Sequence, residues 1–187
     1  MKKIVFISSL FLISINLIGQ NNVNPNLFGF RTSLAFIFFD IQDSVFINNV
    51  KSVSPNVLSF PGGFGNFYHL EGAGYGIKLD EIKKYHKQSK IKTVSNLKKI
   101  ISNKNHQENY IYDFIEIVKK TGSSAIYDAN IISSNPKEVL NIIKLLLDSN
   151  INLLGVELGG ELSNRSYSHF MNIDNYISLS KLYAKSI

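Results

Sequence analysis

The chain has 187 residues, no cysteine and a formal net charge of +6. The absence of cysteine excludes a disulfide framework and a lipidated cysteine, so the fold depends on its core alone. The length corresponds to one domain, which is large enough to bury a substantial core.

The first twenty residues have the order of a secretory signal peptide. Lys2 and Lys3 form a positive start, residues 4–18 are an apolar run interrupted only by Ser and Asn, and Gly19 precedes a polar stretch. An uncleaved membrane anchor is the alternative, but a spanning helix needs about 20 apolar residues. We therefore expect a signal peptide over 1–20. The mature domain over 21–187 would be secreted, periplasmic or on the cell surface, with no stable membrane insertion after cleavage.

Positive charge is concentrated in residues 78–104, which contain nine lysines. A basic segment with interleaved rings is one mark of nucleic-acid binding, but only Tyr85 and His86 are interleaved here and no binding motif frames them. We expect a solvated helix and loop, and no nucleic acid as a partner. Binding of an anionic surface through this segment is a further alternative.

Four apolar runs predict the strands of one sheet. They cover residues 33–39, 56–60, 124–130 and 152–158, and they are continuous rather than alternating. Continuous apolar strands are typical of a parallel sheet that is buried on both faces.

Helical periodicity fills most of the chain between and after these runs. Residues 110–120 repeat apolar side chains at helical spacing and end at Gly122, and Pro136 opens a helix behind Asn135. Residues 172–185 form a last amphipathic helix, and the long polar excursion over 72–109 contains a short helix near 79–87. Alternation of strand and helix predicts an α/β fold with a parallel sheet.

The segment from Gly155 to Leu162 is the most informative for chemistry. An apolar strand ends there in two glycines and a carboxylate, Glu161. In barrel folds catalytic groups project from the carboxyl ends of strands, which makes Glu161 the candidate catalytic residue. Strand alternation places Glu157 on the same face but about 13 Å deeper, too far for a glycosidase carboxylate pair. We expect Glu157 to be an interior carboxylate held by hydrogen bonds.

These residues resemble the clan A glycoside hydrolases, the retaining (β/α)8 enzymes. Their fourth strand ends in an E-x-G-N-E pattern, matched here by Glu157-Leu158-Gly159-Gly160-Glu161. A Pro-Gly-Gly turn often follows their second strand, and Pro61-Gly62-Gly63 matches it. The resemblance implies a partial TIM-type (β/α)8 barrel of about the first four βα units. It also implies that Glu161 is the acid/base and that the substrate is a polysaccharide or oligosaccharide.

The sequence departs from that family at three points. Gly160 stands where the family has a sugar-binding Asn, and Ser59 stands where an Arg is common. The family nucleophile lies on the seventh strand, whereas the strand-like runs here number four. We therefore expect a C-terminal half supplied elsewhere, or a dimer. The alternative function is a non-catalytic carbohydrate-binding or surface protein on a degenerate barrel.

The remaining candidates for substrate binding lie near the predicted strand ends. They are Gly62, Gly63, His69, Asp128, Asn130 and Gly160. Each has a structural alternative: the glycines permit a turn, Asp128 or Asn130 caps or begins one, and His69 belongs to a packed aromatic loop. The four histidines show no metal-ligand spacing, and no dinucleotide-binding pattern is present, so we expect neither a metal nor a cofactor.

Overall fold

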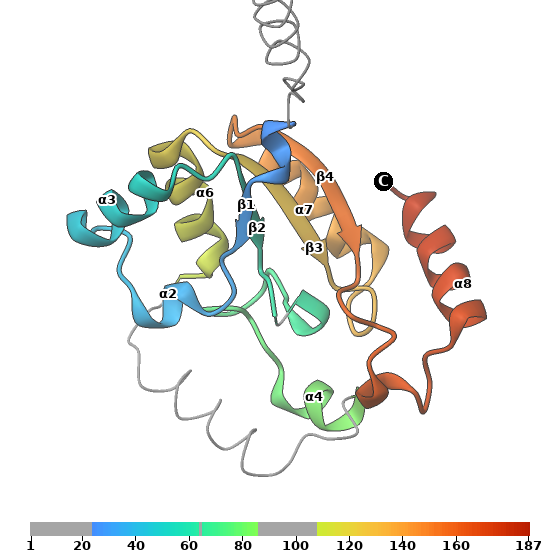
Figure 1. Ribbon diagram of the computed structural model, residues 1–187. Helices are drawn as coiled ribbons and strands as arrows, with labels where there is room; N and C mark the ends of the chain where they lie inside the picture. The colour runs from blue at the N-terminus through green and yellow to red at the C-terminus, as the bar shows by residue number, and fades with distance from the viewer. Residues whose placement is uncertain (1–23, 64, 86–107) are drawn as a thin grey trace, which may run out of the picture.

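The computed structural model describes residues 24–63, 65–85 and 108–187 (Figure 1). The predicted signal peptide and most of the lysine-rich segment lie outside these residues. The fold is α/β, with one four-stranded sheet in which all neighbouring strands are parallel. The strands follow one another in the order of the sequence: β1 (Gly29–Arg31), β2 (Val57–Phe60), β3 (Ser124–Ala129) and β4 (Leu153–Leu158).

Helices connect the strands and lie mainly on one face of the sheet (Figure 1). The longer helices are α3 (Ser44–Val53), α6 (Tyr110–Thr121), α7 (Pro136–Asp148) and α8 (Ile173–Ala184). The short ones are α2 (Ala35–Phe38), α4 (Leu79–Tyr85) and the 3-10 turns η1 (Pro25–Leu27), η2 (Gly65–Phe67) and η3 (Arg165–Tyr167). None of the described helices is both long and apolar enough to cross a membrane.

The sequence signals at the helix ends correspond to real caps. The side chain of Asn109 accepts a hydrogen bond from the Ile111 amide at the start of α6, and Gly122 ends that helix in the left-handed conformation. Asn135 accepts from the Glu138 amide at the start of α7, one residue before Pro136. These contacts satisfy backbone groups that have no partner within the helix.

The core lies between the sheet and the helices α6 and α7. Phe60, Tyr127 and Ala129 point to this side of the sheet and are fully buried. The Phe60 ring stacks on Phe114 of α6 with 5.0 Å between centroids. Burial of large rings at such spacing stabilises this layer.

The predicted strand over residues 33–39 is wrong. The strand is β1, four residues earlier, and the apolar run instead forms α2 after a turn at Ser33, whose φ is 44°. A short continuous apolar run indicates that a segment is buried, but it shows neither the repeat of a strand nor that of a helix. Such a run therefore cannot distinguish the two. The strands predicted over 56–60, 124–130 and 152–158 are confirmed, as are the four predicted helices.

The second face of the sheet is polar toward its carboxyl end. Strand alternation places Arg31, Ser59, Asp128 and Glu157 on this face, opposite the buried rings. Gly155 also belongs to it, and a Cβ there would meet no atom within 4 Å among the described residues. The helices α3, α6 and α7 lie on the other side (Figure 1). On this face Ser59 and Asp128 are buried, whereas the side chains of Arg31 and Glu157 are partly exposed.

Candidate functional site

The carboxyl ends of the strands meet at one edge of the sheet, and Glu161 lies there. Strand β4 ends at Leu158, after which Gly159 and Glu161 both have positive φ, 75° and 53°. The strand alternation that we extended to Glu161 therefore stops at Leu158. A left-handed conformation is unusual for a residue with a side chain and needs support from its surroundings.

Asn66 provides that support through the backbone of Gly160. Its Oδ1 accepts a hydrogen bond from the Gly160 amide at 3.0 Å, and its Nδ2 donates to the Gly160 carbonyl at 2.6 Å. The same Nδ2 lies 3.3 Å from the hydroxyl of Tyr167. Asn66 is buried in η2, directly after the glycine-rich turn. It fixes the peptide that precedes Glu161, and the sequence carries no signal that would have identified it.

The two hydrogen bonds between Asn66 and Gly160 form a clamp, and a polar hollow of about 140 Å³ lies around it. Four of the seven predicted site residues line it: Gly62, Gly63, Gly160 and Glu161. The other lining residues are Arg31, Gly65, Asn66, Asn164 and Tyr167. Apart from Gly65, which belongs to the glycine-rich turn, no sequence pattern pointed to them. The arrangement offers hydrogen-bond donors and acceptors around a single carboxylate.

The Pro-Gly-Gly turn needs glycine at its first glycine position. Gly62 has φ 75°, and a Cβ there would lie 2.7 Å from backbone atoms of Ser33. Its amide donates to Asp128 Oδ2 at 3.2 Å. Both the left-handed φ and the close approach exclude a side chain, so the turn alternative holds for Gly62, which also borders the hollow.

Asp128 lies buried beneath the hollow and does not line it. Arg31 Nη1 is 3.7 Å from Asp128 Oδ2, and Arg31 Nη2 is 2.9 Å from Glu157 Oε2. Burial raises the pKa of Asp128 to about 7; the Arg31 guanidinium opposes this rise and the Glu157 carboxylate adds to it. Glu157 itself is partly exposed and held by Arg31, rather than interior as expected. The two carboxylates are neighbours across β3 and β4 and share one cation.

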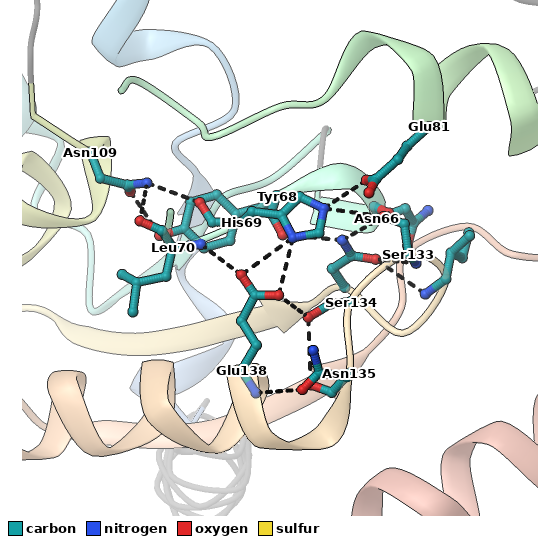
Figure 2. Close-up of polar contacts among 12 residues, drawn as sticks. Asn66, Tyr68, His69, Leu70, Glu81, Asn109, Ser133, Ser134, Asn135 and Glu138 are labelled. Atoms are coloured by element: carbon teal, nitrogen blue, oxygen red, sulfur yellow. Dashed lines mark hydrogen bonds and ion pairs between the residues drawn. The ribbon is translucent and has the colours of Figure 1, made fainter. Parts of the chain in front are cut away.

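His69 lies in a polar network that Ser133 links to the backbone of Asn66 (Figure 2). Its Nε2 is 2.6 Å from Glu81 Oε2 and its Nδ1 is 3.1 Å from Glu138 Oε2. Glu138 also accepts hydrogen bonds from the Leu70 amide and the Ser134 hydroxyl. The buried imidazole thus fastens the loop after β2 to α4 and α7. Both ring nitrogens of His69 contact carboxylates, so neither nitrogen is free to bind a substrate as the sequence analysis expected.

The charges in this network stabilise each other. Burial alone would lower the pKa of His69, but hydrogen bonds and charge from Glu138 and Glu81 outweigh it and raise the pKa above its usual value. Burial would raise the pKa of Glu138, but His69, Ser134 and the Leu70 amide lower it to about 2. An imidazolium between two carboxylates is therefore the stable form near neutral pH.

Asn130 begins a turn, which is the structural alternative that the sequence analysis gave to a role in substrate binding. Its Oδ1 accepts hydrogen bonds from the amides of Ile132 and Ser133, and its Nδ2 donates to the Tyr68 carbonyl at 3.1 Å. The side chain is fully buried. Phe67 and Tyr68 are buried too, so these two rings beside His69 belong to a packed loop.

A second hollow of about 420 Å³ lies on the other side of Glu161, between the end of β4 and the start of α8. Its lining is mostly apolar and includes Leu162, Met171, Ile173 and Tyr176. Glu161 is the one residue that lines both hollows, and it is the one carboxylate in either lining. Across the described ranges, no group of three or more His, Asp or Glu side chains could hold a metal ion.

No protein-family model, no curated protein and no solved structure matches the chain. The assignment of function therefore depends on the residues and geometry of this edge of the sheet.

Replacing Asp128 by Asn should change the pH dependence of stability. The folded-state pKa of about 7 exceeds the ordinary Asp value of 3.8, so the folded state binds the proton more tightly than the unfolded state does. The contribution of the protonated Asp128 carboxyl to the free energy of unfolding is then fully present below about pH 4 and is lost as pH rises through 7. We expect Asp128→Asn to reduce this loss, measured as Tm between pH 5 and 8. The exposed Asp148→Asn is the control, and an unchanged pH slope in Asp128→Asn would contradict the assignment.

Replacing His69 by Gln should destabilise the fold by about 3 kcal/mol at pH 6, because two mostly buried carboxylates lose their shared cation. The raised pKa means that the stabilisation is complete below about pH 6.5 and is lost as pH rises through the folded-state pKa. The difference between variant and wild type should therefore shrink at pH 9. Urea unfolding measures it, with the exposed His169→Gln as a control that should stay within about 0.5 kcal/mol. Equal stability of His69→Gln and wild type at pH 6 would refute the network.

Proposed function

We propose that this chain forms the acid/base half of a retaining glycoside hydrolase site for a polysaccharide or oligosaccharide. The observation that carries the proposal is the position of Glu161. It extends from the carboxyl end of a parallel strand, between a polar and an apolar hollow, on a backbone held by Asn66. A catalytic carboxylate in a parallel βα fold belongs at this edge.

The proposed fold is the first four βα units of a TIM-type barrel, exported by the signal peptide over 1–20. Four parallel strands in sequence order, each joined to the next through helix, support this arrangement. The right-handed twist of such a sheet allows closure once eight strands are present. A remaining half, or a second copy, would complete the site.

The proposed chemistry gives Glu161 two steps. It first donates a proton to the glycosidic oxygen as the bond to the anomeric carbon breaks, and it then accepts a proton from the attacking water. Arg31 and Asn164 are exposed polar side chains in the lining of the polar hollow, and both can donate hydrogen bonds to sugar hydroxyls. A retaining enzyme also needs a nucleophilic carboxylate about 5–5.5 Å from the acid/base. That group would come from the other half of the barrel.

A non-catalytic carbohydrate-binding protein is the second candidate. Two observations favour it: Glu161 is the one carboxylate in the lining of the two hollows beside it, and Gly160 offers no side chain to a sugar hydroxyl. A site of this kind would bind sugar through the same polar hollow without breaking a bond.

An external nucleophile separates the two candidates. With azide and a panel of phenyl glycosides, azide nitrogen can bond to the anomeric carbon while the bond to phenol oxygen breaks and Glu161 supplies the proton to that oxygen. We expect glycosyl azide from the wild type, detected by mass spectrometry. Glu161→Gln should lower its rate about 100-fold or more because the general acid is lost. Asp148→Asn, at the far end of α7, should match the wild type.

The outcomes are distinct. Equal glycosyl azide formation by Glu161→Gln would remove Glu161 from the mechanism. Binding of the glycosides, measured by calorimetry, without any azide product would replace the hydrolase proposal with the carbohydrate-binding one.

Replacing Gly160 by Asn should strengthen sugar binding. A Cβ at this position would meet only Arg31 Nη1, at 3.8 Å, and φ of Gly160 is not positive, so the side chain fits. The Asn amide would add one hydrogen bond to a sugar hydroxyl, worth about 1 kcal/mol or roughly fivefold in Kd. Calorimetry with the same glycosides measures the change. Weaker binding with unchanged Tm would contradict the proposed orientation of the sugar.

A further inference from the structure

The β4 edge of the sheet is less covered than the strands inside it. Every residue of β2 is buried, whereas every residue of β4 is partly or fully exposed. Strands of parallel sheets are normally buried on both faces. The β4 edge also presents backbone groups with no neighbouring strand among the described residues.

Helix α8 lies beside this edge and buries fewer of its side chains than α7 does. Helix α7 follows β3 and buries Val139, Ile142, Ile143 and Leu146. Helix α8 follows β4 in the same way, yet it buries only Tyr183, and it stands beside β4 rather than across the sheet (Figure 1). Since a connecting helix packs over its own strand and the next one, α8 has the position of a helix whose second strand is another polypeptide segment.

The apolar side chains of α8 show where that strand would lie. Ile173 and Ile177 are four residues apart, so they form one stripe, and they are 68% and 42% exposed. Ile173 also lines the apolar hollow of about 420 Å³ between α8 and the end of β4. This surface, made of the β4 edge, the hollow and the Ile173–Ile177 stripe, fits a parallel strand with large apolar side chains.

The opposite edge of the sheet carries such a strand. Phe28 and Phe30 are 57% and 53% exposed. Phe28 is extended, and its carbonyl accepts from the amides of Asn56 and Val57, so it continues β1 by one residue. Phe30 pairs in register with Leu58, which places it on the helix side of the sheet. A helix lying over β1 would cover both rings.

We infer that a second copy of this chain docks its β1 edge on the β4 edge and α8 of the first. The strands meet in parallel, and Phe28 and Phe30 of the second copy pack under the Ile173–Ile177 stripe. One contact thus covers both exposed apolar surfaces. The occupant is a copy of this chain because its β1 edge has the required direction, the aromatic side chains and the correct face.

A twofold axis makes two such contacts at once. Each β1 then lies beside the β4 of the other copy, and eight parallel strands close without a free edge. The contact joins different surfaces of the two copies, so it is head-to-tail and differs from a symmetric β1 to β1 pairing. It depends on the sheet and on α8, and it stands whether or not Glu161 is catalytic.

Charge substitutions test this arrangement. Light scattering after size-exclusion chromatography should give the wild type twice the mass of one chain. Phe30→Glu and Ile177→Lys should each weaken dimerisation at least about 100-fold, because each buries an unpaired charge in both contacts. Leu182→Lys is the matched control: it lies on the same helix, roughly 140° around the axis from Ile177, and is exposed. It should remain a dimer.

Mixing the two variants distinguishes head-to-tail pairing from other dimers. In a mixed dimer, one contact carries both substitutions with opposite charges, and the other contact carries neither. An equimolar mixture should therefore form dimers although each variant alone does not. Circular dichroism checks that both variants are folded, and Phe28→Glu with Ile173→Lys forms a replacement pair. A monomeric wild type, dimers that persist in both variants, or a mixture that stays monomeric would each overturn the inference.

Discussion

Parallel strands impose the constraint on which this structure depends. Each strand must be followed by a connection that returns to the other end of the sheet, and here helices make that return. All carboxyl ends consequently lie at one edge, where the turn after β2, the turn after β3 and the segment after β4 come into contact. Asp128 on β3 binds the turn at Gly62, and Asn66 after β2 binds the segment at Gly160. The candidate site exists because these connections meet.

Buried polar groups hold the loops at this edge together. His69 and Glu138 join the β2 loop to α7, and Asn109 joins the same loop to the start of α6 through the carbonyls of His69 and Leu70 (Figure 2). Each of these side chains satisfies backbone or charged groups that would otherwise be buried without partners. These contacts support the residues around Glu161.

Sequence reasoning identified the parallel α/β fold, three strands and the helices with clear caps. It failed at residues 33–39, where an apolar run with no period was taken as a strand. At the site it found the residues at strand ends and turns, because glycines and the end of an apolar run can be recognised in the local sequence. It did not find Arg31 or Asn66, whose roles come from partners 126 and 94 positions away in the chain. It left His69 and Asn130 between a binding role and a structural role, since the pairing that decides between them is set by tertiary contacts.

The clamp between Asn66 and Gly160 holds Glu161 in position whatever side chain residue 160 carries. Both hydrogen bonds go to the peptide groups of residue 160, and neither depends on its side chain. Substitution at this position can therefore alter ligand contacts while the carboxylate stays in place. A single substitution at position 160 can add or remove a polar side chain beside Glu161 without any change in the hydrogen bonds that hold the loop.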